Sequence, residues 1–181
     1  MSDKINTYTL SIYTENNIGL LNRISAIFLK RHINIESLTT SQSEIDNIFR
    51  FVIVVSVLES KIKRITKQIE KQIEVIAAFY HTDKETIFLE TALYKVKSKS
   101  LFDEKHIQKI IKNSQANIVT VSPDYFVIEK TGWREETEKL YNSLEPYGLL
   151  QFVRSGRISV SKEPMDISNI CLLYTSPSPR D

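Results

Sequence analysis

The order in which two hydrophobic patterns alternate constrains this chain more than any other feature, because the same order occurs twice. Residues 7–14 (TYTLSIYT) alternate between apolar and polar side chains, which is typical of a strand with one buried face. Apolar side chains then recur at helical spacing, which predicts a helix from residue 20 onward. We expect its inward stripe to consist of Leu20, Leu21, Ile24, Ile27 and Phe28.

Two strands, a second helix and a fourth strand are predicted to complete the first unit. The strands are expected at residues 34–42, 48–57 and 73–81, and the helix at 60–72. The lysine-rich face of this helix is typical of ordinary solvated surface. Its apolar stripe is expected to consist of Ile62, Ile65, Ile69 and Ile73.

A second unit with the same order is predicted after residue 85. Its strands are expected at 86–97, 116–122, 125–130 and 149–160, and its first helix at 103–114. Thr131 is expected to cap the second helix, and Gly156 to bend the last strand. The inward helical residues should be Ile107, Ile110 and Ile111, then Trp133, Leu140 and Leu144.

The repeated order of strand, helix, strand, strand, helix and strand predicts an α+β fold of two tandem ferredoxin-like (βαββαβ) domains. We place the first domain at residues 5–82 and the second at 84–162. Residues 163–181 are expected to form a disordered tail. The composition changes abruptly at 171–181, which are either a natural tail or a non-native extension.

Composition excludes several functional classes. Lys and Arg exceed Asp and Glu by 24 − 22 = 2, so net charge gives no reason to expect nucleic acid or a membrane as partner. No segment approaches the roughly 20 apolar residues of a membrane-spanning helix, and we expect a cytoplasmic protein. The single cysteine, Cys171, has no internal disulfide partner, and three scattered histidines lack metal-ligand spacing. We therefore expect no metal site.

The joint between the first strand and the first helix, residues 14–21 (TENNIGLL), is the leading candidate for a binding site. A helix N-terminus presents N–H groups without partners, and Gly19 lets a ligand approach them. The amides of Asn16 and Asn34 can bind either charged end of an α-amino acid. The apolar neighbours that suit a branched side chain are Ile18, Leu20, Leu21 and Ile35. Asn and Gly are also frequent in ordinary turns, so the residues alone leave both interpretations open.

Other sites are less well supported. Residues 49–52 (FRFV) are similar to the aromatic stretch of an RNA-recognition motif (RRM) but lack its glycines. No nucleophile is paired with a base, which argues against catalysis. Residues 154–157 (RSGR) suit either an anion, a partner's acidic surface or a solvent-facing bend.

Long stretches of the chain resemble one protein family. TENNIGLLNRISAIFLKRHINIESLTT, FYHTDKETIFLETALYKVK, ANIVTVSPDYFVIEKTG and LQFVRSGRISV are similar to the regulatory small subunit of acetolactate (acetohydroxyacid) synthase, over residues 5–162. The resemblance implies that the first unit is an ACT domain, which pairs with a second copy and binds branched-chain amino acids at the interface. It places Asn16, Gly19 and Asn34 at effector-contacting positions and makes the N–H groups of Leu20 and Leu21 carboxylate donors. His32 stands where many relatives have glycine.

The resemblance implies a non-catalytic regulatory subunit of a transferase holoenzyme in branched-chain amino acid biosynthesis. Such a subunit binds the catalytic large subunit, raises its activity and confers feedback inhibition by valine or a related amino acid. Thiamine diphosphate, Mg and FAD are expected on the large subunit, and no cofactor on this chain. The alternatives are a stand-alone ACT-type amino-acid sensor and an RRM-like RNA binder.

Overall fold

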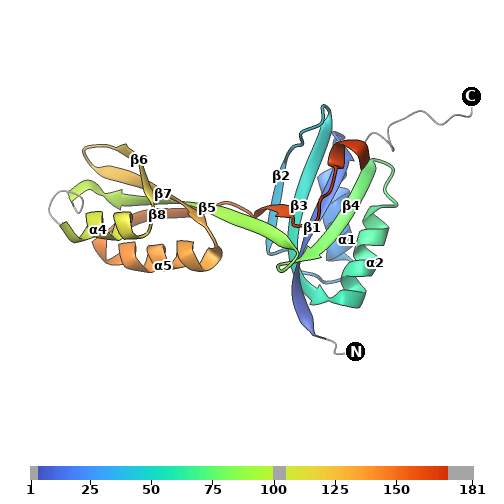
Figure 1. Cartoon of the computed structure of the whole chain (residues 1–181), viewed down its shortest axis with the longest axis horizontal. Coiled ribbons are helices and arrows are strands. Elements are labelled where there is room, and N and C mark those ends of the chain that lie inside the picture. Colours follow the sequence, from blue (N-terminus) through green and yellow to red (C-terminus); the bar gives the residue numbers. More distant parts are fainter. Residues whose placement is uncertain (1–3, 100–104, 171–181) are drawn as a thin grey trace, which may run out of the picture. The chain divides into compact units, whose positions relative to one another are not determined.

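The computed structural model describes residues 4–99 and 105–170 of the 181-residue chain (Figure 1). Its contacts divide the chain into two units. The first contains the residues up to Ile87 and those from Arg157 onward, and the second contains Phe88–Gly156. The second unit is therefore inserted between two segments of the first.

The first unit has the predicted order of elements. They are β1 (Ile5–Glu15), α1 (Leu20–Leu29), β2 (Ser37–Gln42), β3 (Ile48–Leu58), α2 (Glu59–Ile69) and β4 (Val75–Thr82). The sheet order is β2-β3-β1-β4, with every neighbouring pair antiparallel. This is the ferredoxin-like arrangement, so the predicted fold of the first domain is confirmed.

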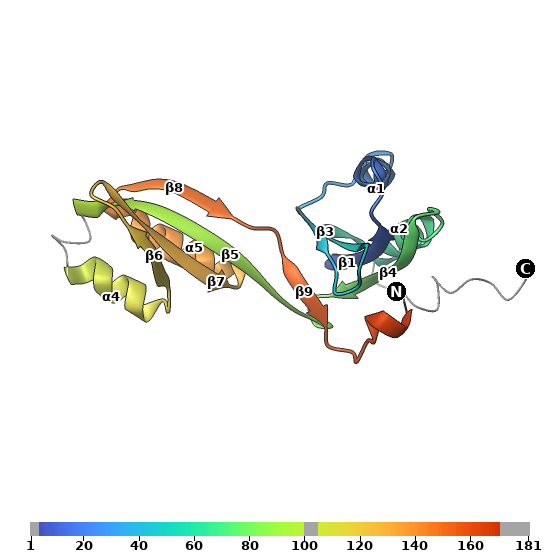
Figure 2. The same ribbon diagram turned by 90° about the horizontal axis from the view of Figure 1, so that it is seen from above.

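Both helices of the first unit cover one face of its sheet (Figure 2). The core between them combines alternate residues of β1 and β3 with the inward stripes of the helices. Its fully buried members include Leu10, Ile12, Ile24, Ile53, Ile62 and Ile65. The period-2 and helical patterns of the sequence therefore meet in one core, as expected.

The opposite face of the first sheet is also covered, and the prediction that β1 has one buried face is wrong. Thr9, Ser11 and Tyr13 point away from the helices, yet each is less than a tenth exposed. Strand β9 (Ile158–Ser161) and the residues after it cover this face, where Ile167 packs in a cluster with Tyr13. Periodicity in β1 cannot reveal a segment that returns some 150 residues later in the chain.

The second unit repeats the topology. Its elements are β5 (Thr86–Lys97), α4 (Lys105–Asn113), β6 (Asn117–Val121), β7 (Tyr125–Gly132), α5 (Arg134–Leu144), the 3₁₀ helix η1 (Glu145–Tyr147) and β8 (Leu149–Arg154). The sheet order is β6-β7-β5-β8, and β9 also pairs with β5. The two helices lie on one side of this sheet (Figure 1). The core includes Tyr94, Val96, Ile107, Phe126, Ile128 and Leu140. The second predicted ferredoxin-like domain is thus confirmed.

Three predicted core residues are exposed instead. Leu21 is 41 % exposed because it lies beside the buried stripe of α1. Ile73 is 96 % exposed because α2 ends at Ile69, so helical spacing no longer applies to it. Trp133 is 57 % exposed because it precedes the first turn of α5.

The predicted cap of α5 is also wrong. Thr131 lies within β7, and its hydroxyl lies 2.9 Å from that of Thr91 on β5. The N-cap is Trp133, whose N–H donates to the carboxylate of Glu136 at 2.8 Å. A side chain reaching back from the first turn therefore satisfies the start of this helix.

The observed units differ from the expected boundaries at 82, 84 and 162. The predicted strand 149–160 is interrupted around Gly156, where a bend was expected, and forms β8 and β9 separately. From Arg157 onward the chain contacts the first unit, since Arg157 donates to Thr9 at 2.9 Å and to Asp83 at 2.6 Å.

The expected disordered tail also differs from the structure over residues 163–170. These residues follow β9, and Asp166 caps a helical turn at residues 167–170. Residues 171–181, where the composition changes, lie outside the described part of the chain, as do residues 103 and 104 of the predicted helix 103–114.

Candidate functional site

The loop before α1 leaves the main chain open to a ligand. Gly19 is the N-cap of α1 and adopts the left-handed conformation, with φ 83°. A Cβ built at Gly19 would have no heavy atom within 4 Å, and no side chain caps the helix. The first turn of α1 is therefore accessible directly above its backbone.

The backbone N–H groups in the first turn of α1 differ in whether they already have a hydrogen-bond acceptor. The Leu20 N–H donates to the Asn17 carbonyl at 3.3 Å, and the Arg23 N–H donates to the Gly19 carbonyl at 3.2 Å. The N–H groups of Leu21 and Asn22 have no hydrogen-bond acceptor within residues 4–99 and 105–170. Leu21 and Asn22 are therefore better placed than Leu20 to bind a carboxylate at the positive end of the helix.

The side chains expected to line this site differ in their exposure to solvent. Asn16 is exposed and Ile18 is fully exposed beside Gly19, with Ile18 at 104 % exposure. Leu20, by contrast, is 2 % exposed and packs in the core, so its side chain cannot contact a ligand in the loop. The absence of the Leu20 side chain from the site was not predicted, because the backbone and the side chain of this first helical residue face different ways. Its N–H faces the loop, whereas its side chain faces the sheet.

An ion pair and a backbone hydrogen bond to Glu74 hold the two ends of the loop before α1 in place. The Glu15 N–H donates to the Glu74 carbonyl at 2.9 Å, and Arg23 Nη2 lies 2.6 Å from Glu74 Oε1. The hydrogen bond from Arg23 lowers the pKa of Glu74 below its ordinary value. This anchor was not predicted, because Arg23 and Glu74 lie 51 residues apart and on a helix and a loop that show no shared pattern.

Asn34 lies at the other end of the first sheet. It lines a groove of about 350 Å³ together with Ile5, His32, Val57 and Lys61. Its neighbour Ile35 is half-buried against the main core. His32 adopts a left-handed conformation with φ 53°, which explains why glycine suits this position.

One chain does not bring Asn16 and Asn34 together. Ser37 of β2 and Thr9 of β1 both pair with Val54 of β3, so Ser37 and Thr9 lie at the same level of the sheet. Asn34 lies just before Ser37 in the chain. Asn16 lies seven residues farther along β1, which corresponds to more than about 20 Å at the rise of a strand. The predicted site residues of one chain therefore form two separate groups, called half-sites below, one at each end of the sheet.

Neither a metal-binding cluster nor a membrane-spanning helix occurs among the described residues. Across 4–99 and 105–170, no group of three or more His, Cys, Asp or Glu side chains is placed to hold a metal ion. Among the same residues, no helix has the length and apolar character needed to cross a membrane.

The chain matches two protein-family models. Residues 10–77 match the AHAS small subunit-like ACT domain, and residues 89–163 match the small subunit of acetolactate synthase. A small subunit from Mycolicibacterium smegmatis is 37 % identical over 167 residues, which cover 92 % of this chain and 98 % of the relative. The chain belongs to the acetolactate synthase small-subunit family.

Further members of the acetolactate synthase small-subunit family match over most of their length. The Bacillus subtilis small subunit is 35 % identical over 154 residues, covering 84 % of this chain and 89 % of the relative. The crystal structure of the Thermotoga maritima small subunit matches with a TM-score of 0.80 and 26 % identity, covering 89 % of this chain and all of that one. The two-domain α+β fold is thus shared with that small subunit.

Proposed function

We propose that this small-subunit chain regulates the catalytic subunit of acetolactate synthase. It binds the large subunit, raises its activity and mediates feedback inhibition by valine or a related branched-chain amino acid. The observation that carries this proposal is the family match, which extends through both domains. Relatives from Mycolicibacterium smegmatis and Bacillus subtilis are acetolactate synthase small subunits by name.

The two half-sites support an effector site shared between two chains. Strand β2 is an edge of the first sheet, because it pairs only with β3. If two β2 edges meet antiparallel about a two-fold axis, the Asn34 end of one chain lies beside the Asn16 and Gly19 end of its partner. We therefore propose a cytoplasmic homodimer, paired through the ACT domains, that binds two effector molecules.

Within each shared site the contacts follow from the exposed groups. The effector carboxylate accepts hydrogen bonds from the N–H groups of Leu21 and Asn22, above Gly19. The Asn16 amide and the partner's Asn34 amide bind the remaining polar atoms. Ile18, whose side chain is fully exposed in one chain, covers the apolar side chain of the effector.

The cofactors of the reaction belong to the other subunit in this proposal. Thiamine diphosphate, Mg and FAD are bound by the catalytic large subunit, and this chain contributes no cofactor ligand. Neither a nucleic acid nor a membrane is a partner.

The RNA-binding alternative is not supported by the sheet. In an RRM the aromatic side chains lie on the open face of the sheet, where bases stack. Phe51 instead points toward the helices and is 6 % exposed in the main core. The other alternative is a stand-alone ACT-type amino-acid sensor. Such a protein would bind the effector without changing the activity of a synthase.

Reconstitution with the purified large subunit tests the proposal. Adding this chain should raise acetolactate synthesis, and valine should then reduce it. Asn16→Ala and Asn34→Ala should each weaken the valine response and leave activation intact. If this chain fails to raise synthase activity, the regulatory proposal is wrong.

A mixing experiment tests whether the site is shared. In a dimer of one Asn16→Ala chain and one Asn34→Ala chain, one site loses both amides and the other retains both. Co-refolded mixtures should therefore recover part of the valine response that each variant lacks alone. No recovery in a mixture shown to contain heterodimers would contradict a site built from two chains.

A further inference from the structure

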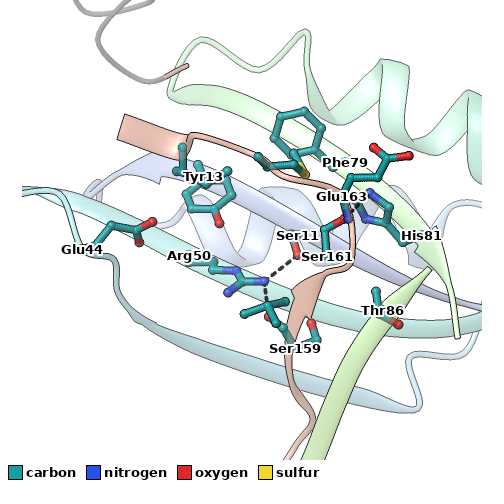
Figure 3. A pocket seen from close by; sticks show the side chains of 13 residues that line it. Ser11, Tyr13, Glu44, Arg50, Phe79, His81, Thr86, Ser159, Ser161 and Glu163 are labelled. Atoms are coloured by element: carbon teal, nitrogen blue, oxygen red, sulfur yellow. Dashed lines mark hydrogen bonds between the residues drawn. The ribbon is translucent and has the colours of Figure 1, made fainter. Parts of the chain in front are cut away.

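The first unit contains a second cavity, on the face of its sheet that α1 and α2 do not cover. It has a volume of about 190 Å³ and lies between β1, β3 and β4 and the segment that begins with β9 (Figure 3). Its lining includes Ser11, Tyr13, Arg50, Phe79, Ser159 and Met165. None of the effector-site residues near Gly19 or Asn34 lines it.

Arg50 places in this cavity a positive charge that makes no ion pair within the described residues. Its Nη2 donates to Ser11 Oγ at 2.9 Å and to the Ser159 carbonyl at 2.6 Å, and both acceptors are uncharged. No carboxylate of residues 4–99 and 105–170 lies within ion-pair distance of Arg50. A half-buried guanidinium without a counter-ion favours an anionic ligand.

The guanidinium keeps donors for such a ligand. Its Nη1 makes no hydrogen bond within the described residues and is not among the atoms shielded from solvent. Arg50 Nε and the hydroxyl of Ser159 are buried and have no hydrogen-bond partner among residues 4–99 and 105–170, and Ser159 is 7 % exposed. Arg50 also lies over the Tyr13 ring, with Cζ 5.6 Å from its centroid, which holds the guanidinium in place.

One part of the cavity wall is apolar. Tyr13 and Phe79 meet edge to face, with ring centroids 6.5 Å apart, and Met165 and Ile167 complete the lining on the side of the C-terminal segment. A cavity of this volume suits a molecule of a few heavy atoms rather than a nucleotide. The guanidinium of Arg50 beside this apolar part of the wall suits a short aliphatic carboxylate.

We propose that this cavity binds a small aliphatic carboxylate, with the carboxylate on Arg50 and the apolar chain against Tyr13, Phe79 and Met165. This site is distinct from the effector site at α1 and does not depend on the proposed regulatory function. Glu44 and Glu163 also line the cavity, so a ligand that carries an ammonium group as well has charge partners for both ends.

Nuclear magnetic resonance titration of the full chain tests the proposal with three probes. Isobutyrate carries the carboxylate alone, L-valine adds an ammonium group, and isobutylamine carries the amine alone. Isobutyrate or L-valine should shift the amide signals of Ser11, Arg50 and Ser159, whereas isobutylamine should not. Tighter binding of L-valine than of isobutyrate would show that Glu44 and Glu163 contribute by pairing with the ammonium group. Equal or weaker binding of L-valine would show that they do not.

Variants separate this cavity from the α1 site. Arg50→Gln should weaken carboxylate binding about tenfold or more, because a charge-assisted hydrogen bond is lost. Arg64→Gln removes an exposed arginine of α2 and should leave binding unchanged. Met165→Trp fills the cavity while keeping Arg50, and it should also weaken binding, even if Arg50→Gln disturbs the fold.

Two results would overturn the proposal. One is the absence of shifts at the cavity amides with both carboxylates. The other is binding that survives both Arg50→Gln and Met165→Trp. Shifts confined to Leu21 and Asn22 also count against the cavity, although they support the proposed effector site, so the two hypotheses fail independently.

Discussion

Replacing Gly19 by aspartate and by asparagine tests the effector site with a matched pair. Both residues tolerate the left-handed conformation at φ 83°, and both have nearly the same size. A Cβ at Gly19 meets no atom of the described residues within 4 Å, and the backbone strain that φ 83° imposes on a side chain is shared by both variants, so it cancels when they are compared. The two variants therefore differ in one property, a negative charge above the first turn of α1.

The expected effect of that charge follows from its distance to the ligand. The carboxylate introduced by Gly19→Asp would lie about 4 Å from the effector carboxylate, where like charges repel by about 1 kcal/mol in water and about 4 kcal/mol at the surface of a protein. Gly19→Asp should thus weaken effector binding between about fivefold and several hundredfold relative to Gly19→Asn. The helix dipole stabilises the introduced carboxylate itself by about 0.3–1 kcal/mol, which protects the fold of the variant.

Calorimetric titration with valine, leucine and isoleucine measures this difference, and valine inhibition of the reconstituted holoenzyme provides the second readout. Activation of the large subunit should be similar for both variants. Raising the ionic strength should narrow the gap between Gly19→Asp and Gly19→Asn, because salt screens exposed charges. Equal effector affinity in the two variants would refute the location of the carboxylate above Gly19.

Three further predictions concern stability and the second half-site. Asn34→Ala should weaken effector affinity in calorimetry as much as Asn16→Ala does, without changing thermal stability. Because Arg23 lowers the pKa of Glu74, the ion pair stabilises the fold above about pH 4.5 and loses this contribution as the pH falls through the folded pKa; Glu74→Gln should remove this dependence in urea titrations. Burial raises the pKa of Tyr94 to about 12 from 10.0, so stability should fall between pH 10 and 12 by up to about 3 kcal/mol, and Tyr94→Phe should abolish the fall in denaturation measurements.

The elements and cores of both domains could be predicted because each is set by local periodicity. The stripes of α1 and α2 and the alternation in β1 and β3 are visible within windows of about a dozen residues. The errors occur at the ends of helices, where spacing stops applying. Ile73 follows the end of α2 and Trp133 precedes the start of α5, so both are exposed although each continues a helical pattern.

The path of the chain after Gly156 could not be predicted in the same way. β9 continues a strand-like pattern from β8, and nothing local indicates that it contacts the first unit. The relevant signal is a charged residue in an otherwise apolar strand. Arg50 interrupts the run IFRFVIVVSV, and its acceptor is the Ser159 carbonyl, 109 residues away. Such a residue indicates a buried polar contact without identifying the partner.

The sequence indicates which residues could form the candidate site but not how they are arranged. The sequence indicates Asn16, Gly19 and Asn34 because their side chains and backbone suit an amino acid, and each lies in a loop beside α1. It does not indicate that α1 separates them, since ten helical residues span about 15 Å. Only the strand register places them at opposite ends of the sheet.

That separation offers a physical route from effector binding to regulation. A ligand held by groups of one chain shifts an assembly only if that chain changes conformation between the two states, because the shift cannot exceed the ligand's differential affinity for them. A ligand held by Gly19 of one chain and Asn34 of the other binds only when the two ACT domains are correctly paired. Its binding free energy therefore depends on the dimer geometry, and a preference of about 1–3 kcal/mol for one arrangement is sufficient to change the activity of a partner that responds to that arrangement. Because linkage is reciprocal, binding of the large subunit should change the affinity for valine by the same factor, which calorimetry on the free chain and on the complex can compare.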